Sequence, residues 1–179
     1  MNELSTWAAT FGVALTPDQS ARFAIYEALL LEWNERISLT AIRDPREMRI
    51  RHFLDSLTCI TATGPLDECS LIDIGTGAGF PGLPLKIAFP GLRLTLVDSV
   101  AKKTRFLELV AGELGLDGVS VITDRAEDLG RDARFREALR QRFPRGVESG
   151  REAEGRGEGS AAHIEHWTGR HPFHLVQHA

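Results

Sequence analysis

The part of this 179-residue chain best suited to chemistry is a glycine cluster, Gly75-Thr76-Gly77-Ala78-Gly79, which directly follows a short apolar run. A glycine-rich turn lets a ligand approach the backbone closely, because no Cβ blocks the way. Asp98 ends the next apolar run along the chain, and an acid in that place can accept hydrogen bonds from the hydroxyls of a ribose. Together these residues indicate a site for a nucleoside-containing cofactor.

The glycine spacing allows more than one interpretation. Gly77-x-Gly79-x-x-Gly82 formally matches a dinucleotide fingerprint. Gly75-x-Gly77-x-Gly79, preceded by Asp73, is closer to the turn of methyltransferases that use S-adenosylmethionine. Glycine motifs alone are weak evidence, so a turn without a ligand, with Asp98 serving only as a helix cap, stays open as an alternative.

The elements that must position this turn alternate between strand and helix. Apolar runs at residues 71–74, 92–97 and 119–122 predict strands, and helical spacing predicts helices at 83–89 and 102–114. Strand–helix–strand–helix–strand indicates an α/β fold with a parallel sheet and helices on its faces. Such sheets bind ligands at the carboxyl ends of their strands, where the glycine turn and Asp98 are expected.

The first third of the chain is predicted to be helical. Thr16 as the cap, Pro17 at the first helical position and Gln19 form a capping-box start. A second start of the same kind begins at Asp44, and Gly64 precedes a proline that ends the helical pattern. We therefore expect an N-terminal helical segment at 1–64, followed by a cofactor-binding core at 65–135.

Residues 136–179 look unlike the rest of the chain. We find no convincing buried strand there, and Arg, Glu and Gly dominate residues 145–159. Such a composition buries little apolar surface to offset the entropy of ordering, so we expect disorder at least from 145 to 160. The prediction is an atypical tail and a sheet that is incomplete after its third strand.

Several separate motifs run in a fixed order between about residues 15 and 129. They are Glu32-Trp33-Asn34, residues 37–42, residues 52–57, residues 73–85, Val97-Asp98-Ser99, Lys102-Lys103, Arg105-Phe106-Leu107 and Arg125-Ala126-Glu127. This series resembles the bacterial small-subunit ribosomal RNA guanine-N7 methyltransferases, the glucose-inhibited division protein B family. The resemblance is specific over that span, because it rests on several motifs rather than one.

The resemblance implies a Rossmann-like methyltransferase core with an N-terminal helical extension, and transfer of methyl from S-adenosylmethionine to guanine N7 of 16S ribosomal RNA or the small ribosomal subunit. It also implies a set of cofactor contacts, to which the glycine motif adds Gly77 and Gly79. The contacts that it implies are Gly75, Phe80, Asp98, Ser99, Val100, Ala126 and Glu127. For Phe80 and Ala126 the alternative is ordinary packing.

The family continues with a fourth strand that carries an arginine contact to the cofactor, and no such motif follows Arg136. A shifted reading frame, a deletion join and a divergent replacement are three explanations of that departure.

Because that motif is missing, two other functions stay open. One is a truncated, non-catalytic remnant that binds cofactor or RNA. The other is a nicotinamide-dependent oxidoreductase, which would lack an evident Tyr-x-x-x-Lys, since Tyr26 is the only tyrosine.

The charge balance gives RNA binding no general support, because the formal net charge is −4. Phosphate contacts would depend on local basic residues. The candidates are Arg36, Arg43, Arg46, Arg49, Arg51, Lys102, Lys103 and Arg105. Charge alone favours a solvated helix face, and the family resemblance favours RNA.

His52 and Asp55 lie three residues apart, on one face of a predicted helix. Guanine N7 already carries a lone pair and loses no proton when it is methylated, so the reaction needs no general base. We therefore favour structural roles for these two residues, in helix packing or in a hydrogen bond to the glycine turn, and assign no catalytic residue.

The remaining features exclude several other classes. Cys59 and Cys69 form no CxxC pair and have no neighbouring histidines, so we expect free thiols and no metal. No run approaches the apolar length of a membrane span, and the N-terminus lacks the basic start and apolar block of a secretory signal. We expect a cytoplasmic monomer.

Overall fold

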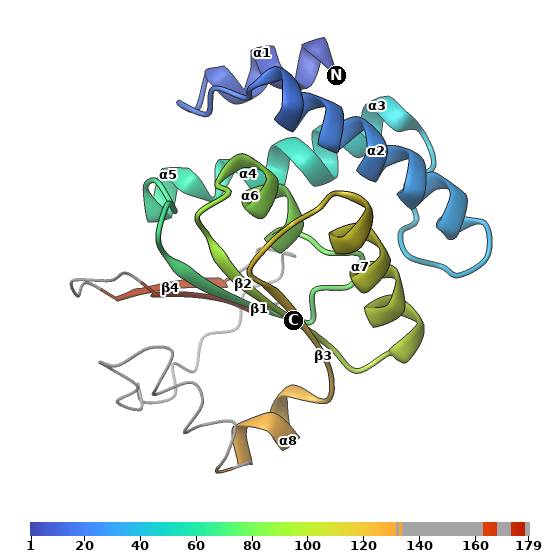
Figure 1. The fold of residues 1–179 in the computed structure, drawn as a ribbon, viewed down its shortest axis with the longest axis vertical. Helices are drawn as coiled ribbons and strands as arrows, with labels where there is room; N and C mark the ends of the chain where they lie inside the picture. Colours follow the sequence, from blue (N-terminus) through green and yellow to red (C-terminus); the bar gives the residue numbers. More distant parts are fainter. Residues whose placement is uncertain (132, 134–162, 168–172, 178–179) are drawn as a thin grey trace, which may run out of the picture.

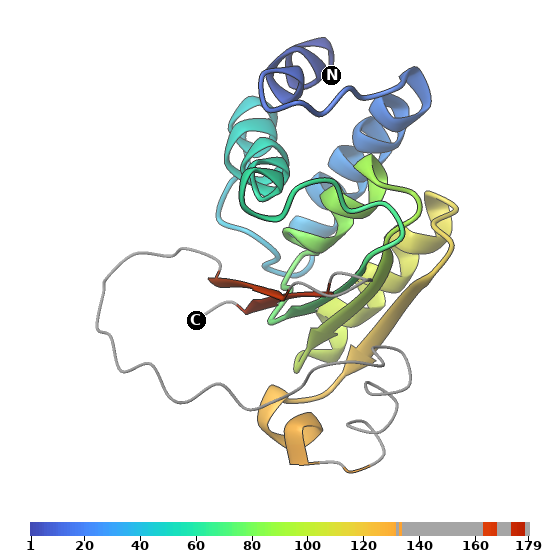
Figure 2. The same ribbon diagram turned by 90° about the vertical axis from the view of Figure 1, so that its left-hand side faces the viewer.

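The structure is a computed structural model that describes residues 1–131, 133, 163–167 and 173–177. Its centre is a sheet whose parallel strands alternate with helices along the chain (Figure 1). The N-terminal helices gather on one side of the molecule, above α6 and α7, and the short helix α8 lies on the opposite side (Figures 1 and 2). This arrangement confirms the α/β fold class.

The N-terminal helices begin where the sequence predicts. After α1 (Asn2–Ala9), helix α2 (Pro17–Asn34) starts with the full capping box, in which Thr16 and Gln19 bond to each other's backbone N–H groups. At the second predicted start, Asp44 Oδ1 accepts the backbone N–H of Glu47 at 2.8 Å. The chain then runs through α3 (Pro45–Met48), η1 (Arg49–Leu54), α4 (Asp55–Thr58) and α5 (Ile60–Thr63). Segment η1 is a π-helical turn that the sequence pattern does not reveal.

The three predicted strands and the two helices between them are confirmed. Strands β1 (Ser70–Ile74), β2 (Arg93–Asp98) and β3 (Val119–Thr123) are parallel neighbours, and helices α6 (Gly82–Ala88) and α7 (Ala101–Glu113) connect them. Helix α8 (Ala126–Arg131) follows β3. The carboxyl ends of β1, β2 and β3 therefore meet at one edge, where the glycine turn begins.

The prediction that no strand follows Arg136 is wrong for two segments. In the described part of the chain the strand order is β3-β2-β1-β5-β4, where β4 is His163–Trp167 and β5 is Phe173–Gln177. Strand β5 lies parallel to β1, and β4 is antiparallel to β5. Strand β5 joins the sheet through β1, about a hundred residues earlier, and β4 joins it only through β5, so no local pattern reveals either pairing. The disorder expected at 145–160 falls outside the described residues.

Alternate strand residues face two different apolar layers, as the period of a strand requires. Leu71, Leu94 and Leu96 pack with the helices of the N-terminal segment and with α6 and α7 in one large cluster. Ile72 and Val97 point to the other face, where Leu129 of α8 covers them. The helical extension and the sheet thus share one core, which fixes the extension relative to the glycine turn. Among the described residues, no helix is long and apolar enough to cross a membrane.

Candidate functional site

The glycine turn leaves the carboxyl end of β1 in a conformation that needs glycine. Gly75, Gly77 and Gly79 all have positive φ, at 74°, 60° and 104°, a region that residues with a Cβ seldom adopt. The backbone N–H groups of Gly75 and Thr76 both donate to Val97 O, at 2.8 and 3.1 Å. The turn is therefore held against the end of β2.

Asp73 fixes the base of this turn from within the core. Its side chain is fully buried, and its Oδ2 accepts the Thr76 hydroxyl at 2.8 Å and the Gly82 N–H at 2.9 Å. These bonds tie the last strand residues to both ends of the turn. Hydrogen bonds to a buried carboxylate are stronger than neutral ones, so Asp73 makes the turn rigid.

Asp98 and the glycine turn, which the sequence placed at one edge, are in direct contact. Asp98 Oδ2 accepts the Gly77 N–H at 3.0 Å, and its Oδ1 accepts the Val100 N–H at 2.8 Å. Lys103 Nζ lies 3.8 Å from Oδ2. A carboxylate has about four acceptor positions, so two backbone bonds leave capacity for the hydroxyls of a bound ribose.

The glycines of the turn face different surroundings. A Cβ on Gly77 would meet only Gly75 O within 4 Å, at 3.9 Å, so the space beside it is open to a ligand. A Cβ on Gly79 would meet Leu83, Tyr26 and Leu107 at 3.0 Å or less. Gly77 therefore suits a close approach by a ligand, whereas Gly79 permits packing against the core.

The other candidate residues occupy the same edge of the sheet. Ser99 and Val100 are exposed at the start of α7, directly after Asp98. Ala126 and Glu127 open α8 just beyond β3, whose Thr123 pairs with Asp98. Together they flank the carboxyl ends of β2 and β3, on the side of Asp98 away from the glycine turn.

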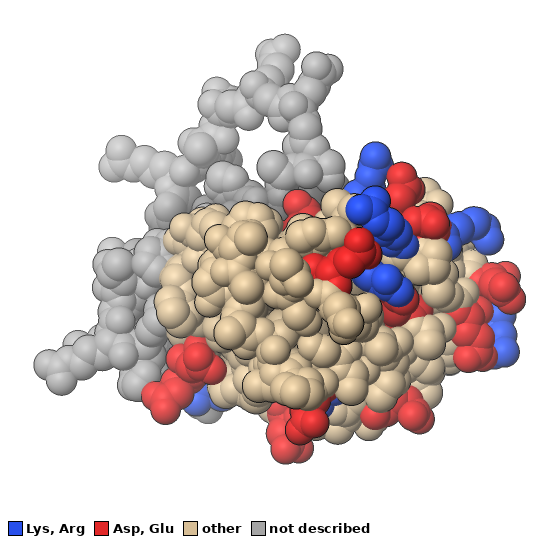
Figure 3. Space-filling view, turned by 90° about the horizontal axis from the view of Figure 1, so that it is seen from above, with Lys and Arg blue, Asp and Glu red and all other residues tan. Residues whose placement is uncertain are grey.

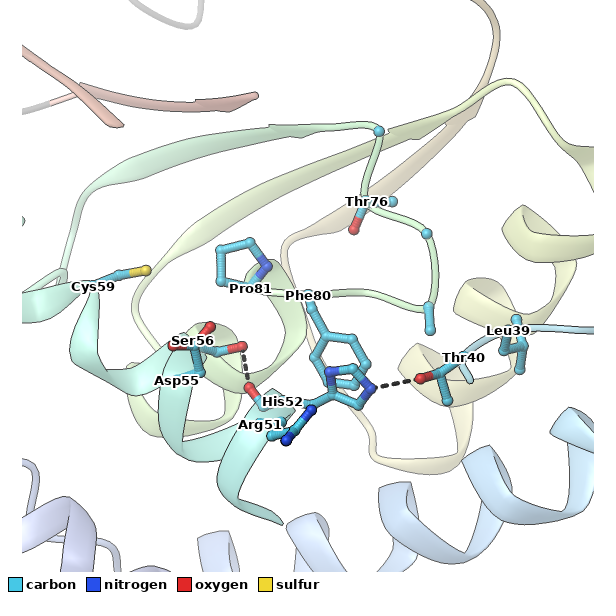
Figure 4. A pocket seen from close by; sticks show the side chains of 13 residues that line it. Leu39, Thr40, Arg51, His52, Asp55, Ser56, Cys59, Thr76, Phe80 and Pro81 are labelled. Carbon is cyan, nitrogen blue, oxygen red and sulfur yellow. Dashed lines mark hydrogen bonds between the residues drawn. The ribbon is translucent and has the colours of Figure 1, made fainter. Parts of the chain in front are cut away.

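A cavity of about 460 Å³ opens beside the turn, within the usual range for ligand pockets. One wall comes from the turn and the other from the helical extension (Figure 4). Its lining residues are Leu39, Thr40, Arg51, His52, Asp55, Ser56, Cys59, Gly75, Thr76, Gly77, Ala78, Phe80 and Pro81. Sequence reasoning missed Thr40, Ser56 and Cys59 as site residues. The segments 37–42 and 52–57 were the available signal for Thr40 and Ser56, and Cys59 lies outside both.

Phe80 joins the two walls. Its ring stacks on His52 with centroids 4.5 Å apart and planes inclined by 16°, and it lies 5.7 Å from the Tyr26 ring. Tyr26 in turn donates its hydroxyl to Ala78 O at 2.5 Å. The predicted link between His52 and the turn is therefore a ring stack rather than a hydrogen bond.

His52 is held as a neutral ring. Thr40 Oγ1 accepts the Ile42 N–H at 3.1 Å and lies 2.7 Å from His52 Nε2, so we assign the hydroxyl proton as donated to Nε2. Burial lowers the pKa of His52 below its ordinary value, although a backbone hydrogen bond to Arg51 and the charge of Asp55 act in the opposite direction. At neutral pH the ring orients Phe80 and carries no charge.

The His52→Phe variant is expected to lose stability at neutral pH and to become less sensitive to acid. Loss of the Thr40 bond costs about 1 kcal/mol, or about 2–4 °C in Tm. Because the folded state lowers the pKa of His52, the wild-type chain loses this contribution as pH falls below about 6.5. Thermal melts at about pH 7.5 and 5 should show the Tm difference narrowing in acid, and a constant difference would contradict a neutral His52.

Cys59 lines the cavity but is a poor nucleophile. Burial raises the pKa of its thiol to about 11, and the charges of Asp55 and Asp73 add to the effect. At pH 8 only about one thiol in a thousand is then ionised. We expect iodoacetamide to alkylate Cys59 roughly a hundredfold more slowly than free cysteine, as measured by peptide mass spectrometry. Fast labelling in the native state, equal to that in urea, would contradict this.

The predicted basic residues include a cluster of five arginines between residues 36 and 51, and three of the five are paired with acids. Arg49 forms two bonds to Glu27, at 2.6 and 2.7 Å, and these bonds raise the pKa of its guanidinium. Arg36 pairs with Glu32 at 2.9 Å, and Arg46 lies 3.8 Å from Glu3. Basic and acidic side chains are interspersed over the helical end of the molecule (Figure 3).

Of the five arginines in the cluster, Arg43 and Arg51 have no ion pair within 4.0 Å among the described residues. Only Arg51 of these two lines the cavity. No group of three His, Cys, Asp or Glu side chains that could hold a metal ion occurs in the described part of the chain.

Comparison with known proteins adds a family to this geometry. Residues 19–142 match the family described as GidB, rRNA small subunit methyltransferase G. A protein named ribosomal RNA small subunit methyltransferase G from Roseiflexus castenholzii is 51% identical over 137 residues, which is 76% of this chain and 58% of that protein. Proteins of the same name from Alkaliphilus metalliredigens and Carboxydothermus hydrogenoformans are 45% and 46% identical, over 77% and 81% of this chain and 58% and 61% of their own lengths.

This chain thus spans little more than half the length of the curated relatives it matches. The matched segment nevertheless takes in most of the helical extension, the whole glycine turn and Asp98. The chain belongs to the rRNA small subunit methyltransferase G family.

Proposed function

We propose that the chain binds S-adenosylmethionine at the glycine turn and Asp98, and transfers its methyl group to guanine N7 of 16S ribosomal RNA. The observation that carries this proposal is the contact between Asp98 and Gly77 N–H at 3.0 Å, next to open space at Gly77. A nucleoside with an attached chain fits such a site, because Asp98 can take ribose hydroxyls while the turn admits the chain.

Each part of the cofactor has residues suited to it. Gly75, Gly77 and Phe80 line the cavity in which the methionine portion would lie. Ser99 and Val100 are exposed after β2, on the side where the adenine would lie. Ala126 and Glu127 begin α8 on that same side. The bound cofactor supplies an electrophilic methyl group, and every other task falls to the protein.

The protein's main task in this reaction is alignment of the methyl donor and the acceptor. Guanine N7 attacks with a lone pair that it already has, so no side chain must remove a proton. Neutral, hydrogen-bonded His52 and protonated Cys59 agree with that requirement, since neither is prepared to act as a base or nucleophile. Fixed positions of donor and acceptor contribute most of the acceleration in such a case.

The oxidoreductase alternative receives no support. Tyr26, the only tyrosine, is fully buried and donates its hydroxyl to Ala78 O. Burial also raises its pKa well above the ordinary value, so it cannot serve as the acid of a hydride-transfer site.

We propose that the chain acts in the cytoplasm, as a monomer, on RNA of the small subunit.

Two measurements test the proposal. Calorimetric titration with S-adenosylmethionine should give micromolar binding, and S-adenosylhomocysteine should raise Tm. Incubation with 16S RNA or small subunits should then produce 7-methylguanosine, detected as strand cleavage after borohydride and aniline. Cofactor binding without methylation would support the truncated, non-catalytic remnant. A folded chain that binds no cofactor would overturn the proposal.

A further inference from the structure

Two charged side chains on the helical wall of the cavity are not used by the fold. Arg51 and Asp55 both line the cavity, and both are exposed. Among the described residues neither side chain takes part in a hydrogen bond or in an ion pair within 4.0 Å. Figure 4 shows both on the helical wall of the cavity. Their neighbours His52 and Ser56 are, in contrast, already committed to internal bonds.

The wall that carries these two residues is rigid. Phe53 and Leu57, on the opposite side of the same helical run, are completely buried in the core. The Ser56 hydroxyl bonds to His52 O at 2.5 Å, and His52 is fixed by Thr40. Arg51 and Asp55 are four residues apart and therefore share one face. A donor and an acceptor are thus displayed side by side on a fixed surface, as recognition of a ligand requires.

The pair matches one edge of guanine. On its Watson–Crick edge guanine offers O6 as an acceptor, followed by N1–H and the N2 amino group as donors. A carboxylate accepts both donors, and a guanidinium donates to O6. Adenine has the reverse pattern at the corresponding atoms, with an amino donor in place of O6 and a ring nitrogen acceptor in place of N1–H. Arg51 and Asp55 together therefore favour guanine over adenine.

We propose that Asp55 and Arg51 bind the Watson–Crick edge of the acceptor guanine in this cavity, with Asp55 on N1–H and N2 and Arg51 on O6. The inference rests on the proposed function and names the acceptor site within it. N7 lies on the other side of the purine from N1 and N2. A base held by that edge on the helical wall presents N7 to the glycine turn opposite, where the methyl group would be.

This orientation requires an unpaired base, because Asp55 and Arg51 occupy the edge that a complementary base would use. Enzymes that act on a base commonly read it in this extruded form. The cavity offers Leu39, Phe80 and Pro81 as apolar surface for the flat faces of the purine. Arg51 is also the only arginine of the predicted basic cluster that combines a cavity position with freedom from ion pairs, as far as the described residues extend.

The test uses binding rather than turnover, so it does not depend on catalysis by this chain. The probes are short single-stranded RNAs of uridine that contain one guanosine or one inosine, which lacks only the N2 amino group. In the presence of S-adenosylhomocysteine, fluorescence anisotropy should show about tenfold tighter binding of the guanosine RNA. Asp55→Ala should reduce that ratio to about one. Arg51→Ala should weaken both RNAs by a similar factor, because both retain O6.

Asp67→Ala is the matched control, since Asp67 is an exposed acid before β1, at the end of the strand away from the turn. It should leave both affinities unchanged. Calorimetry with S-adenosylhomocysteine shows whether each variant keeps a folded cofactor site. Absence of cofactor binding by the wild-type chain would overturn the proposed function, while the comparison of the two RNAs can still be made. A wild-type chain that does not prefer guanosine, or an Asp55→Ala variant that keeps the preference, would overturn the acceptor-site inference.

Discussion

Replacing Asp98 with alanine is expected to weaken S-adenosylmethionine binding by at least about a hundredfold. The carboxylate is only 6% exposed and already points at the glycine turn through Gly77 N–H. Hydrogen bonds to a charged group are worth about 1.5–3 kcal/mol each, and two ribose hydroxyls would lose theirs. A loss of about 3 kcal/mol corresponds to about a hundredfold in Kd. Isothermal titration of both proteins measures it directly.

A competing role for Asp98 is purely structural. Its Oδ1 accepts the Val100 N–H two residues on, in a turn that leads into α7, whose N-cap Val100 has no side-chain cap bond. Thermal melts separate the two roles, because loss of this turn bond lowers Tm while loss of a ligand contact lowers affinity. Asp98→Asn keeps one acceptor oxygen and should lie between the wild-type chain and Asp98→Ala. The exposed Asp117 is a suitable control for alanine substitution of an acid. An Asp98→Ala chain with wild-type affinity and lowered Tm would leave Asp98 with the structural role alone.

Features that depend on neighbouring residues can be predicted from the sequence. The capping box at Thr16 and Gln19 joins residues three apart, and the structure contains both of its bonds. Apolar runs with glycine-rich or polar ends predict the three parallel strands, and their register follows once they are paired. The contact between Asp98 and the glycine turn follows from the rule that parallel strands end at one edge. The sequence alone therefore locates the two parts of the site that we assign to the cofactor.

The other half of the cavity depends on contacts between distant residues. His52 stacks on Phe80, 28 positions later in the sequence, and bonds to Thr40 across a loop. No periodicity records these contacts, because they depend on how the helical extension is rotated against α6 and α7. The π-helical turn η1 changes the directions in which Arg51 and His52 leave the helix axis. Its sequence pattern does not distinguish it from an ordinary α-helix. The sequence does not reveal strands β4 and β5 for the same reason, since β5 joins the sheet only through β1, far earlier in the chain, and β4 only through β5.

The proposed acceptor site of Arg51 and Asp55 follows from the way the helical extension lies against the glycine turn. The spacing of Asp55 and His52 alone predicts that both act in helix packing or in a bond to the turn. In the structure only His52 does so, through Thr40 and Phe80. Asp55 and Arg51 are left facing the cavity. The same helical run thus buries Phe53 and Leu57 in the core on one side and leaves Arg51 and Asp55 exposed to the cavity on the other.

The Gly79→Ala substitution is expected to destabilise the chain by about 2–5 kcal/mol. An added Cβ would lie 2.5 Å from Leu83 Cδ1 and 2.7 Å from the Tyr26 hydroxyl, distances that real Cβ atoms do not show. Overpacking of this kind costs about 1–3 kcal/mol, and the φ of 104° at Gly79 adds strain that only glycine avoids. Since a whole domain is stable by about 5–15 kcal/mol, urea denaturation should show a large shift in midpoint.

Gly112→Ala provides the matched control, because it is the same substitution in a place without these constraints. Gly112 lies within α7, and a Cβ there would meet no heavy atom within 4 Å. Alanine in a helix is more favourable than glycine by about 0.5–1 kcal/mol, so this variant should gain stability. Opposite signs for the two variants would show that Gly79 is required for close packing under the turn. Equal effects would mean that Leu83 and Tyr26 move aside at little cost, and Tyr26 could then not be the support that holds Ala78 and the glycine turn in place.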